Sequence, residues 1–283
     1  MRMDRLFDIL NTPMAVLGIS FVVVVVTVFL YLDEVTVTSE GTPAPNPAPG
    51  GVVLFSDTFD RDDDTFVPPW DLARGAGTDR LTTDSTVVRK GTHSAKFRAL
   101  HDSDANAGTT DPWAQLQYKD MFCERDDRYL GWSWYLPADF PATIPSGSWI
   151  EIGQIGTGAP WGYPPLHFAY YGSSIALVNK SNNGGWRHVA SIPTQRGQWQ
   201  DVVAHVKFSK SSSVGFVELW VNGQPVMLSN GSTRQYMNTI NQDASGCGGW
   251  LPTLYNGSKG YWGWLTLYYD EAKVGTSYAA AAP

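Results

Sequence analysis

The sequence is poor in the motifs that most enzyme classes leave in a chain. It contains no Ser-His-Asp nucleophile elbow, no glycine-rich phosphate loop and no CxxC pair, and its five histidines show no metal-site spacing. Serine-triad hydrolysis, nucleotide-driven chemistry and a zinc centre are therefore not indicated. Basic residues are also few: 20 lysines and arginines stand against 27 aspartates and glutamates, for a net charge of −7 at pH 7. That balance argues against a nucleic-acid partner.

Two further scarcities bear on the fold. No helical period of useful length follows residue 40, and no internal repeat occurs, so the bulk of the chain is neither a helical bundle nor a solenoid. Cysteine occurs only twice, as Cys123 and Cys247. On an exported domain we expect these two residues to form a disulfide, which would stabilise the fold by about 3–5 kcal/mol through entropy removed from the unfolded chain.

Strand-like patterns, in contrast, are abundant. Between Trp199 and Leu228 apolar and polar side chains alternate with a period of two, which is typical of a sheet buried on one face. Asn222-Gly223 supplies the two residues with positive φ that a tight hairpin turn requires. The alternation predicts that the core face carries Val202, Ala204, Val206, Phe208, Val217, Leu219 and Val221.

Similar short segments, separated by clusters of Gly, Pro, Asp and Asn, continue through the chain. This spacing predicts an all-β, two-sheet antiparallel jelly-roll sandwich over residues 52–278, with a tail at 279–283. The further strands are expected at Val52–Phe55, Ser85–Val88, Ser94–Leu100, Ala114–Met121, Leu130–Leu136, Ser148–Ile155, Pro164–Tyr171, Ser174–Asn179, Trp186–Ala190 and Gly260–Val274.

The N-terminal part differs in character. Met14–Leu32 holds 19 residues without a charge, long enough for a helix that crosses a bilayer. Arginines precede the apolar run and acidic residues follow it, so the positive-inside rule places the N-terminus in the cytoplasm and the sandwich in the periplasm or outside the cell. A cleaved signal peptide is the rival interpretation, but no small-x-small site follows the run. We therefore expect an interfacial segment and single membrane span at 1–37 and a proline-rich linker at 38–51.

The predicted span also has a face suited to packing in a membrane complex. Small and hydroxyl side chains allow close approach of helices in lipid, and the preceding apolar residues would touch the interface or a partner. The order of residues 7–34 faintly resembles bacterial light-harvesting α-polypeptides, although no histidine lies within Met14–Leu32 to bind a bacteriochlorophyll. The packing residues that we predict are Leu6, Phe7, Gly18, Ser20 and Thr27.

A second resemblance covers most of the chain. The segments Gly197–Val202, Gly215–Gly223 and Tyr268–Gly275 are similar to concanavalin A-like jelly rolls of the heparin-lyase-like and alginate- or glucuronan-lyase-like polysaccharide lyases. The resemblance implies β-elimination on a uronic acid polymer, with a carboxylate neutraliser, a base and an acid on one sheet. If the chain is a lyase, the residues implied are Gln154, His167, His205 and Tyr268, with Tyr170 as a further neighbour.

The sequence departs from the alginate-lyase pattern in three places. The segment Trp113–Tyr118 lacks the Arg-x-Glu-x-Arg pattern, Gly156 stands where the histidine of Gln-x-His belongs, and Lys259 is displaced in the Tyr-rich segment. These departures predict that neutraliser and base are not both in place. Apart from lyase chemistry, aromatic side chains beside Gly and Pro suggest a carbohydrate or partner surface formed by Trp161, Tyr163, Trp250, Trp262 and Trp264.

Acidic residues near both ends of the sandwich raise the question of a metal. Related sandwiches often hold calcium where the first strand meets the last, and carboxylates are suitable ligands. A structural calcium ion is therefore a possibility at Asp57, Asp60 and Asp270, although an acidic run such as residues 60–64 is more often a solvated turn. No other cofactor is indicated.

Three functions are consistent with these patterns. The one we expect is a non-catalytic accessory subunit of a membrane protein complex, with a pigment-bearing reaction-centre–light-harvesting assembly as the leading case. The missing lyase residues and the uncleaved anchor favour it. The alternatives are a membrane-tethered polysaccharide lyase and a carbohydrate-binding module that displays aromatic platforms to a polysaccharide.

Overall fold

The computed structural model describes residues 50–100, 113–158, 164–180, 185–241, 244, 246–257 and 263–283. Within these ranges no helix has the length and apolar character needed to span a bilayer. The predicted span Met14–Leu32 lies outside the described residues, as does nearly all of the linker at 38–51. The same holds for Leu6, Phe7, Gly18, Ser20 and Thr27, and for Trp161, Tyr163 and Trp262.

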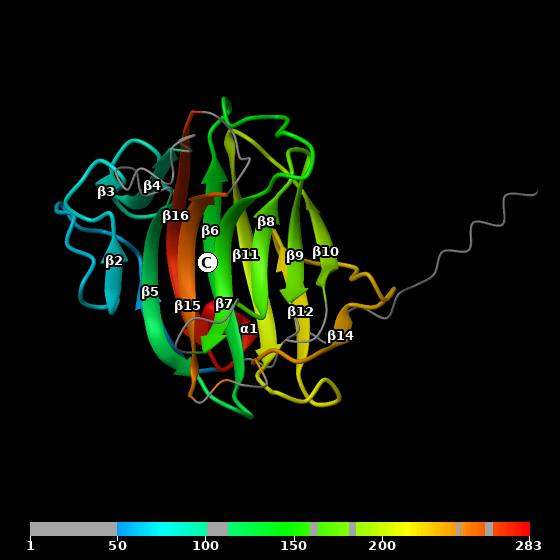
Figure 1. Cartoon of the computed structure of the whole chain (residues 1–283). Coiled ribbons are helices and arrows are strands. Elements are labelled where there is room, and N and C mark those ends of the chain that lie inside the picture. Colours follow the sequence, from blue (N-terminus) through cyan, green and yellow to red (C-terminus); the bar gives the residue numbers. More distant parts are fainter. Residues whose placement is uncertain are drawn as a thin grey trace, which may run out of the picture. The chain divides into compact units, whose positions relative to one another are not determined.

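The described chain folds into two antiparallel sheets, which form the two layers of Figure 1. The first sheet has nine strands in the order β13-β12-β11-β6-β16-β4-β3, with β1 paired to β16 and β14 to β12. The bounds of its strands are β1 Val53–Asp57, β3 Leu81–Asp84, β4 Ser94–Leu100, β6 Asp127–Leu136, β11 Gln198–Lys207, β12 Phe216–Val221, β13 Gln224–Pro225, β14 Arg234–Tyr236 and β16 Trp264–Gly275.

The second sheet has seven strands in the order β10-β9-β8-β7-β15-β5-β2. Strands far apart in sequence are neighbours here, since β15 lies between β7 and β5 (Figure 1). Its bounds are β2 Leu72–Arg74, β5 Trp113–Phe122, β7 Ile150–Gly158, β8 Leu166–Tyr170, β9 Ser174–Lys180, β10 Trp186–Pro193 and β15 Gly248–Asn256. The expected all-β jelly-roll sandwich is confirmed.

The core lies between the sheets and follows the predicted alternation. Val202, Ala204 and Val206 of β11 are fully buried in the main hydrophobic cluster, as are Val217 and Leu219 of β12. Burial of each of these valine and leucine side chains contributes about 1.5–3 kcal/mol relative to exposure. The hairpin after β12 turns at Asn222 and Gly223 with φ of 50° and 77°, the left-handed conformation that a type I′ turn requires.

One strand prediction was wrong, and one central strand was missed. Residues 85–88 form a bend and turn, and the strand in this region is β3, which begins four residues earlier at Leu81. The central strand β15 was missed because Gly248, Gly249 and Pro252 resemble turn residues, and proline cannot donate to a ladder. The structure accommodates these residues where the β15 register shifts, between Gly249 and Trp250 and again between Pro252 and Tyr255.

The chain ends in a short helix, α1 (Tyr278–Ala281), capped by the Ser277 hydroxyl, which accepts a hydrogen bond from the Ala280 amide. Cys123 and Cys247 are joined by a disulfide that follows the end of β5 and precedes β15. Phe122 of β5 and Gly248 of β15 are partners in the ladder. The disulfide therefore links these two strands directly beyond their last paired residues.

Candidate active site

The residues implied by the lyase resemblance are divided between the two sheets. Gln154 of β7 and His167 of β8 are direct partners in the ladder of the seven-stranded sheet. His205 and Tyr268 belong to β11 and β16 of the nine-stranded sheet. Tyr170 points into the core, where its hydroxyl donates to the Pro141 carbonyl. A single site that combines all five residues is therefore excluded.

His205 has both ring nitrogens engaged. Nδ1 lies 2.5 Å from Oε2 of Glu218, and Nε2 lies 2.6 Å from Oδ1 of Asp127. The Tyr129 ring stacks on the imidazole with ring centroids 3.9 Å apart. Burial alone would raise the pKa of Glu218, but hydrogen bonds from His205 and Arg234 hold it below its usual value. His205 of β11 therefore links β6 and β12 through hydrogen bonds. Neither ring nitrogen is available to bind a substrate.

Gln154 and His167 lie on the outer face of the seven-stranded sheet. In β8, Leu166, Phe168 and Tyr170 point into the core, so the alternation turns His167 to the other face. Its side chain is only 1% exposed, and Nδ1 has no hydrogen-bond partner within the described structure. Burial lowers the pKa of His167 to about 3, despite a hydrogen bond to the backbone of Pro164. The imidazole is therefore neutral at pH 7.

Glu151 joins this pair on the same face. It is a ladder partner of Ala169 in β8 and of Tyr255 in β15, and it is 4% exposed. Burial raises the pKa of Glu151 to about 8, which a hydrogen bond with the Gln154 side chain only partly offsets. Its Oε1 atom has no partner among the described residues. At pH 7 Glu151 is thus a neutral carboxylic acid that can donate a hydrogen bond.

The sequence indicated neither Glu151 nor the role of the β7–β8 ladder. Gly156, where the Gln-x-His pattern would place a histidine, has φ of +81°, and a Cβ there would lie 2.7 Å from the Thr239 carbonyl oxygen. No side chain fits at that position. His167 lies opposite Gln154 instead, so the histidine comes from the neighbouring strand. Only the strand pairing, which a linear pattern does not show, brings the two together.

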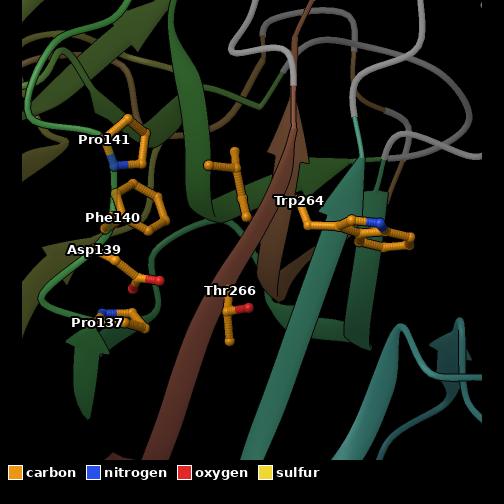
Figure 2. A pocket seen from close by; sticks show the side chains of 7 residues that line it. Pro137, Asp139, Phe140, Pro141, Trp264 and Thr266 are labelled. Atoms are coloured by element: carbon orange, nitrogen blue, oxygen red, sulfur yellow. The ribbon is translucent and has the colours of Figure 1, made fainter.

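The predicted aromatic surface is also corrected. Trp250 is 2% exposed and packs in the core, so it offers no platform. Trp264 is 46% exposed but belongs to the nine-stranded sheet, where it borders a hollow also lined by Pro137, Asp139, Phe140, Pro141, Leu265 and Thr266. In Figure 2 Trp264 and the segment 137–141 lie on opposite sides of Thr266. This hollow is on the other sheet from Gln154 and His167 and is not part of the same site.

The outer face of the seven-stranded sheet carries aromatic residues that sequence reasoning missed. They form a chain of ring contacts, which we call the aromatic belt: Trp113, Tyr255, Trp149 and Trp186. Trp186 also packs edge-to-face on the His167 ring, with centroids 4.5 Å apart. The signal was hidden because these residues are far apart in the sequence: Trp113 and Trp186 begin β5 and β10, Trp149 directly precedes β7, and Tyr255 lies near the end of β15.

The acidic residues considered for calcium accept hydrogen bonds from other groups of the protein. No group of three or more His, Cys, Asp or Glu side chains suited to a metal occurs in the described ranges. Asp57 accepts hydrogen bonds from Trp70 and Arg61, and Asp60 accepts from Thr92 and His93. Asp270 accepts from three backbone amides, and burial raises its pKa to about 7, which weakens it as a ligand for a hard cation.

An antiparallel sandwich with a buried acid, an amide and a neutral imidazole beneath an aromatic belt has the features of a carbohydrate-active protein. Comparison with known families agrees. A model of the family described as "Polysaccharide lyase" matches residues 65–273, and the chain belongs to that family. Among curated proteins none matches the chain.

Solved structures of similar fold include two lyases. The endo-β-1,4-glucuronan lyase of the fungus Trichoderma reesei aligns with a TM-score of 0.64 at 20% identity, over 82% of this chain and 99% of that one. The alginate lyase Aly36B aligns with a TM-score of 0.54 at 13% identity, over 78% and 95%. A carbohydrate esterase of the Shiga toxin-encoding bacteriophage phi24B aligns with a TM-score of 0.52 at 10% identity, over 80% and 99%. At these identities the likeness shows the shared sandwich fold.

These findings correct the functional expectation. The interpretation as a non-catalytic accessory subunit of a photosynthetic membrane complex is wrong, because the family match covers most of the sandwich. The pigment-bearing partners expected with it are withdrawn as well. The resemblance to the alginate- and glucuronan-lyase-like polysaccharide lyases is confirmed.

Proposed function

We propose that this chain cleaves a uronic acid polysaccharide by β-elimination on the outer face of the seven-stranded sheet. The observation that carries the proposal is the group formed by Glu151, Gln154 and His167, three polar side chains that share one face of two neighbouring strands. Two of them hold a buried polar atom without a partner in the described structure. Such unsatisfied groups cost about 1–3 kcal/mol each and are common where a ligand completes the hydrogen bonding.

The reaction requires three tasks that these residues can share. A base removes the proton at C5 of the uronic acid, the C4–O4 bond breaks, a C4=C5 double bond forms, and a proton reaches the departing O4. Neutralising the uronate carboxylate makes the C5 proton more acidic and stabilises the charge that develops. No oxidant or cofactor is needed for this balance.

Glu151 and Gln154 are assigned to the carboxylate. The neutral acid of Glu151 and the amide of Gln154 are hydrogen-bond donors, and neither repels an anionic sugar. An ionised glutamate at this position would oppose substrate binding, so burial of Glu151 serves the chemistry directly.

His167 is assigned as the base, because its Nδ1 carries a free lone pair when the imidazole is neutral. A bound carboxylate would raise the low pKa of this imidazole and strengthen it as a base. Tyr255, the ladder partner of Glu151, is assigned to protonate the leaving oxygen. Since His167 is 1% exposed beneath Trp186, substrate must shift the Trp186 indole to reach Nδ1.

For the substrate, a β-1,4-linked glucuronan is the first polymer to test and alginate the second, by analogy with the two lyases of similar fold. We further propose that the apolar run Met14–Leu32 anchors the enzyme in a membrane with the sandwich on the periplasmic or extracellular side, where such polymers occur.

The test is incubation of the purified chain with glucuronan, alginate and a neutral glucan, followed by the ultraviolet absorbance of the unsaturated product. We expect absorbance to rise with a uronic acid polymer only. Variants Glu151→Ala and Gln154→Ala should each lower the rate by roughly 10²–10³-fold, as for loss of one preorganised donor. Binding without any rise in absorbance would instead favour a carbohydrate-binding module.

A further inference from the structure

The aromatic belt crosses the seven-stranded sheet at an angle to its strands. Successive ring centroids lie 5.4 Å apart from Trp113 to Tyr255, 5.5 Å from Tyr255 to Trp149 and 6.2 Å from Trp149 to Trp186. Each of the four rings remains partly exposed, and Trp186 is 46% exposed. The belt is therefore a continuous apolar track on the surface and not a part of the core.

Cations stand at both ends of this track. The guanidinium of Arg74 on β2 lies 4.4 Å from the centre of the Trp113 ring. The ammonium of Lys180 on β9 lies 4.8 Å from the centre of the Trp186 ring. Stacking on an indole holds a cation in place. Contact with Trp113 holds Arg74 at one end of the belt, and contact with Trp186 holds Lys180 at the other.

Small apolar side chains form the floor beside the belt. Ala169, Ala176 and Val178 form a separate small cluster on this face, and Trp149 packs against it. Small side chains at these positions of β8 and β9 leave room for an indole to lean across two strands. Trp149 can therefore meet Trp186, although it starts three strands away in the sheet order.

The dimensions indicate what kind of ligand fits. Arg74 and Lys180 are five strand spacings apart in the sheet order, or about 24 Å across the sheet, the length of about four to five linked sugar units. Sugar rings stack on aromatic side chains through their C–H faces, and their carboxylates make their strongest hydrogen bonds with cations. A track of rings with a cation at each end matches an extended polyanionic sugar chain.

We propose that the belt binds a uronic acid oligomer of at least four units across the strands, with Arg74 and Lys180 each holding a sugar carboxylate outside the cleavage position. The inference rests on the proposed function for the identity of the sugar and adds the direction, length and charge contacts of the bound chain. It assigns Arg74, Lys180, Trp113 and Trp186 as binding residues, with Trp186 beside His167 and Trp113 at the opposite end of the belt.

The chain offers a matched control for each type of change. On the nine-stranded sheet Arg98 lies 4.3 Å from the centre of the Trp264 ring, the same arrangement as Arg74 on Trp113. Trp264 is also 46% exposed, as Trp186 is. Arg98→Ala and Trp264→Ala therefore remove an equal charge or an equally exposed indole from a face that the proposal leaves unused.

The experiment measures binding by isothermal titration calorimetry with glucuronan oligomers of two to six units, in the His167→Ala background to prevent turnover. We expect affinity to rise steeply up to four or five units. Arg74→Ala and Lys180→Ala should each weaken binding of the longer oligomers by roughly 5–20-fold and leave the dimer unchanged, and Trp186→Ala should act similarly. The effects of both cations should shrink at high salt.

Two results would overturn the inference. One is equal affinity for short and long oligomers; the other is a loss in Arg98→Ala or Trp264→Ala as large as in the belt variants. Failure of the proposed function has a different signature. Belt-dependent binding with no elimination by the native chain removes the lyase assignment and keeps the belt, whereas elimination that belt variants leave unaltered removes the belt and keeps the lyase.

Discussion

Gln154 and His167 face each other across the ladder of β7 and β8, so that a glutamine–histidine pair found on one strand in the resembling alginate lyases is divided here between two strands. A side chain does not fit at Gly156, and the histidine that faces Gln154 is His167 of the neighbouring strand. The chemistry of the face therefore depends on the register of two strands.

Glu151 should give the stability of the fold a distinctive dependence on pH. Its pKa in the folded chain, about 8, lies above the ordinary value of 4.5, so the folded state keeps a proton that the unfolded state has lost between these values. Stability should fall as pH rises through this window and level off above it. The raised pKa of Asp270 also makes stability fall as pH rises. The wild type must therefore be compared with Glu151→Gln, which should lack the part of the fall that is due to Glu151.

Urea unfolding of both proteins at several pH values between 4 and 9 measures the difference. If the gap in unfolding free energy between the wild type and Glu151→Gln stays constant with pH, the carboxyl is not held neutral by the fold.

Replacing Val206 with Asp should destabilise the sandwich by several kcal/mol, because it buries a carboxylate without a partner between the two sheets. Val214 is 45% exposed in the turn before β12, and Val214→Asp is the matched control, with an expected effect below about 0.5 kcal/mol. Thermal unfolding followed by circular dichroism compares them. Equal melting temperatures would show that the face assignment of β11 is wrong.

The disulfide should stabilise the fold by up to about 5 kcal/mol, because it closes a loop of more than one hundred residues in the unfolded chain. Cys123→Ser with Cys247→Ser should lower the unfolding midpoint without changing the far-ultraviolet spectrum. Mass spectrometry of the unreduced wild type checks the bond itself, and two alkylatable thiols would contradict it.

His205→Ala should act on stability and not on chemistry. The change removes the shared partner of Glu218 and Asp127, at a cost of about 1 kcal/mol, because both carboxylates are partly exposed and Glu218 keeps its hydrogen bond from Arg234. The turnover number of the folded fraction should match that of the wild type. A loss of turnover with unchanged stability would contradict this prediction and indicate that His205 takes part in catalysis.

The sequence sufficed for the fold because the strands that matter most alternate strictly. Val202, Val206 and Leu219 were assigned to the correct face from period two alone, and Asn222-Gly223 marked the hairpin. The sequence did not reveal β15, because Pro252 and two glycines resemble turn residues. The strand forms nevertheless, with shifts in its register near these residues.

For the site, the sequence identified Gln154 and His167 but grouped them with His205 and Tyr268 of the opposite sheet. Nothing in a linear pattern tells which sheet a strand joins. Glu151 was missed because a glutamate in a strand is ordinarily exposed and ionised; only burial from both neighbouring strands makes it an acid.

The measurement that tests the central claim most directly is mass spectrometry of the products formed from glucuronan by the wild type, His167→Ala and Tyr268→Phe. We predict oligomers with an unsaturated terminal sugar, lighter by one water than hydrolysis products, from the wild type and from Tyr268→Phe. His167→Ala should form them about 10²–10⁴-fold more slowly. Saturated oligomers, an intact polymer, or full activity of His167→Ala would contradict the account.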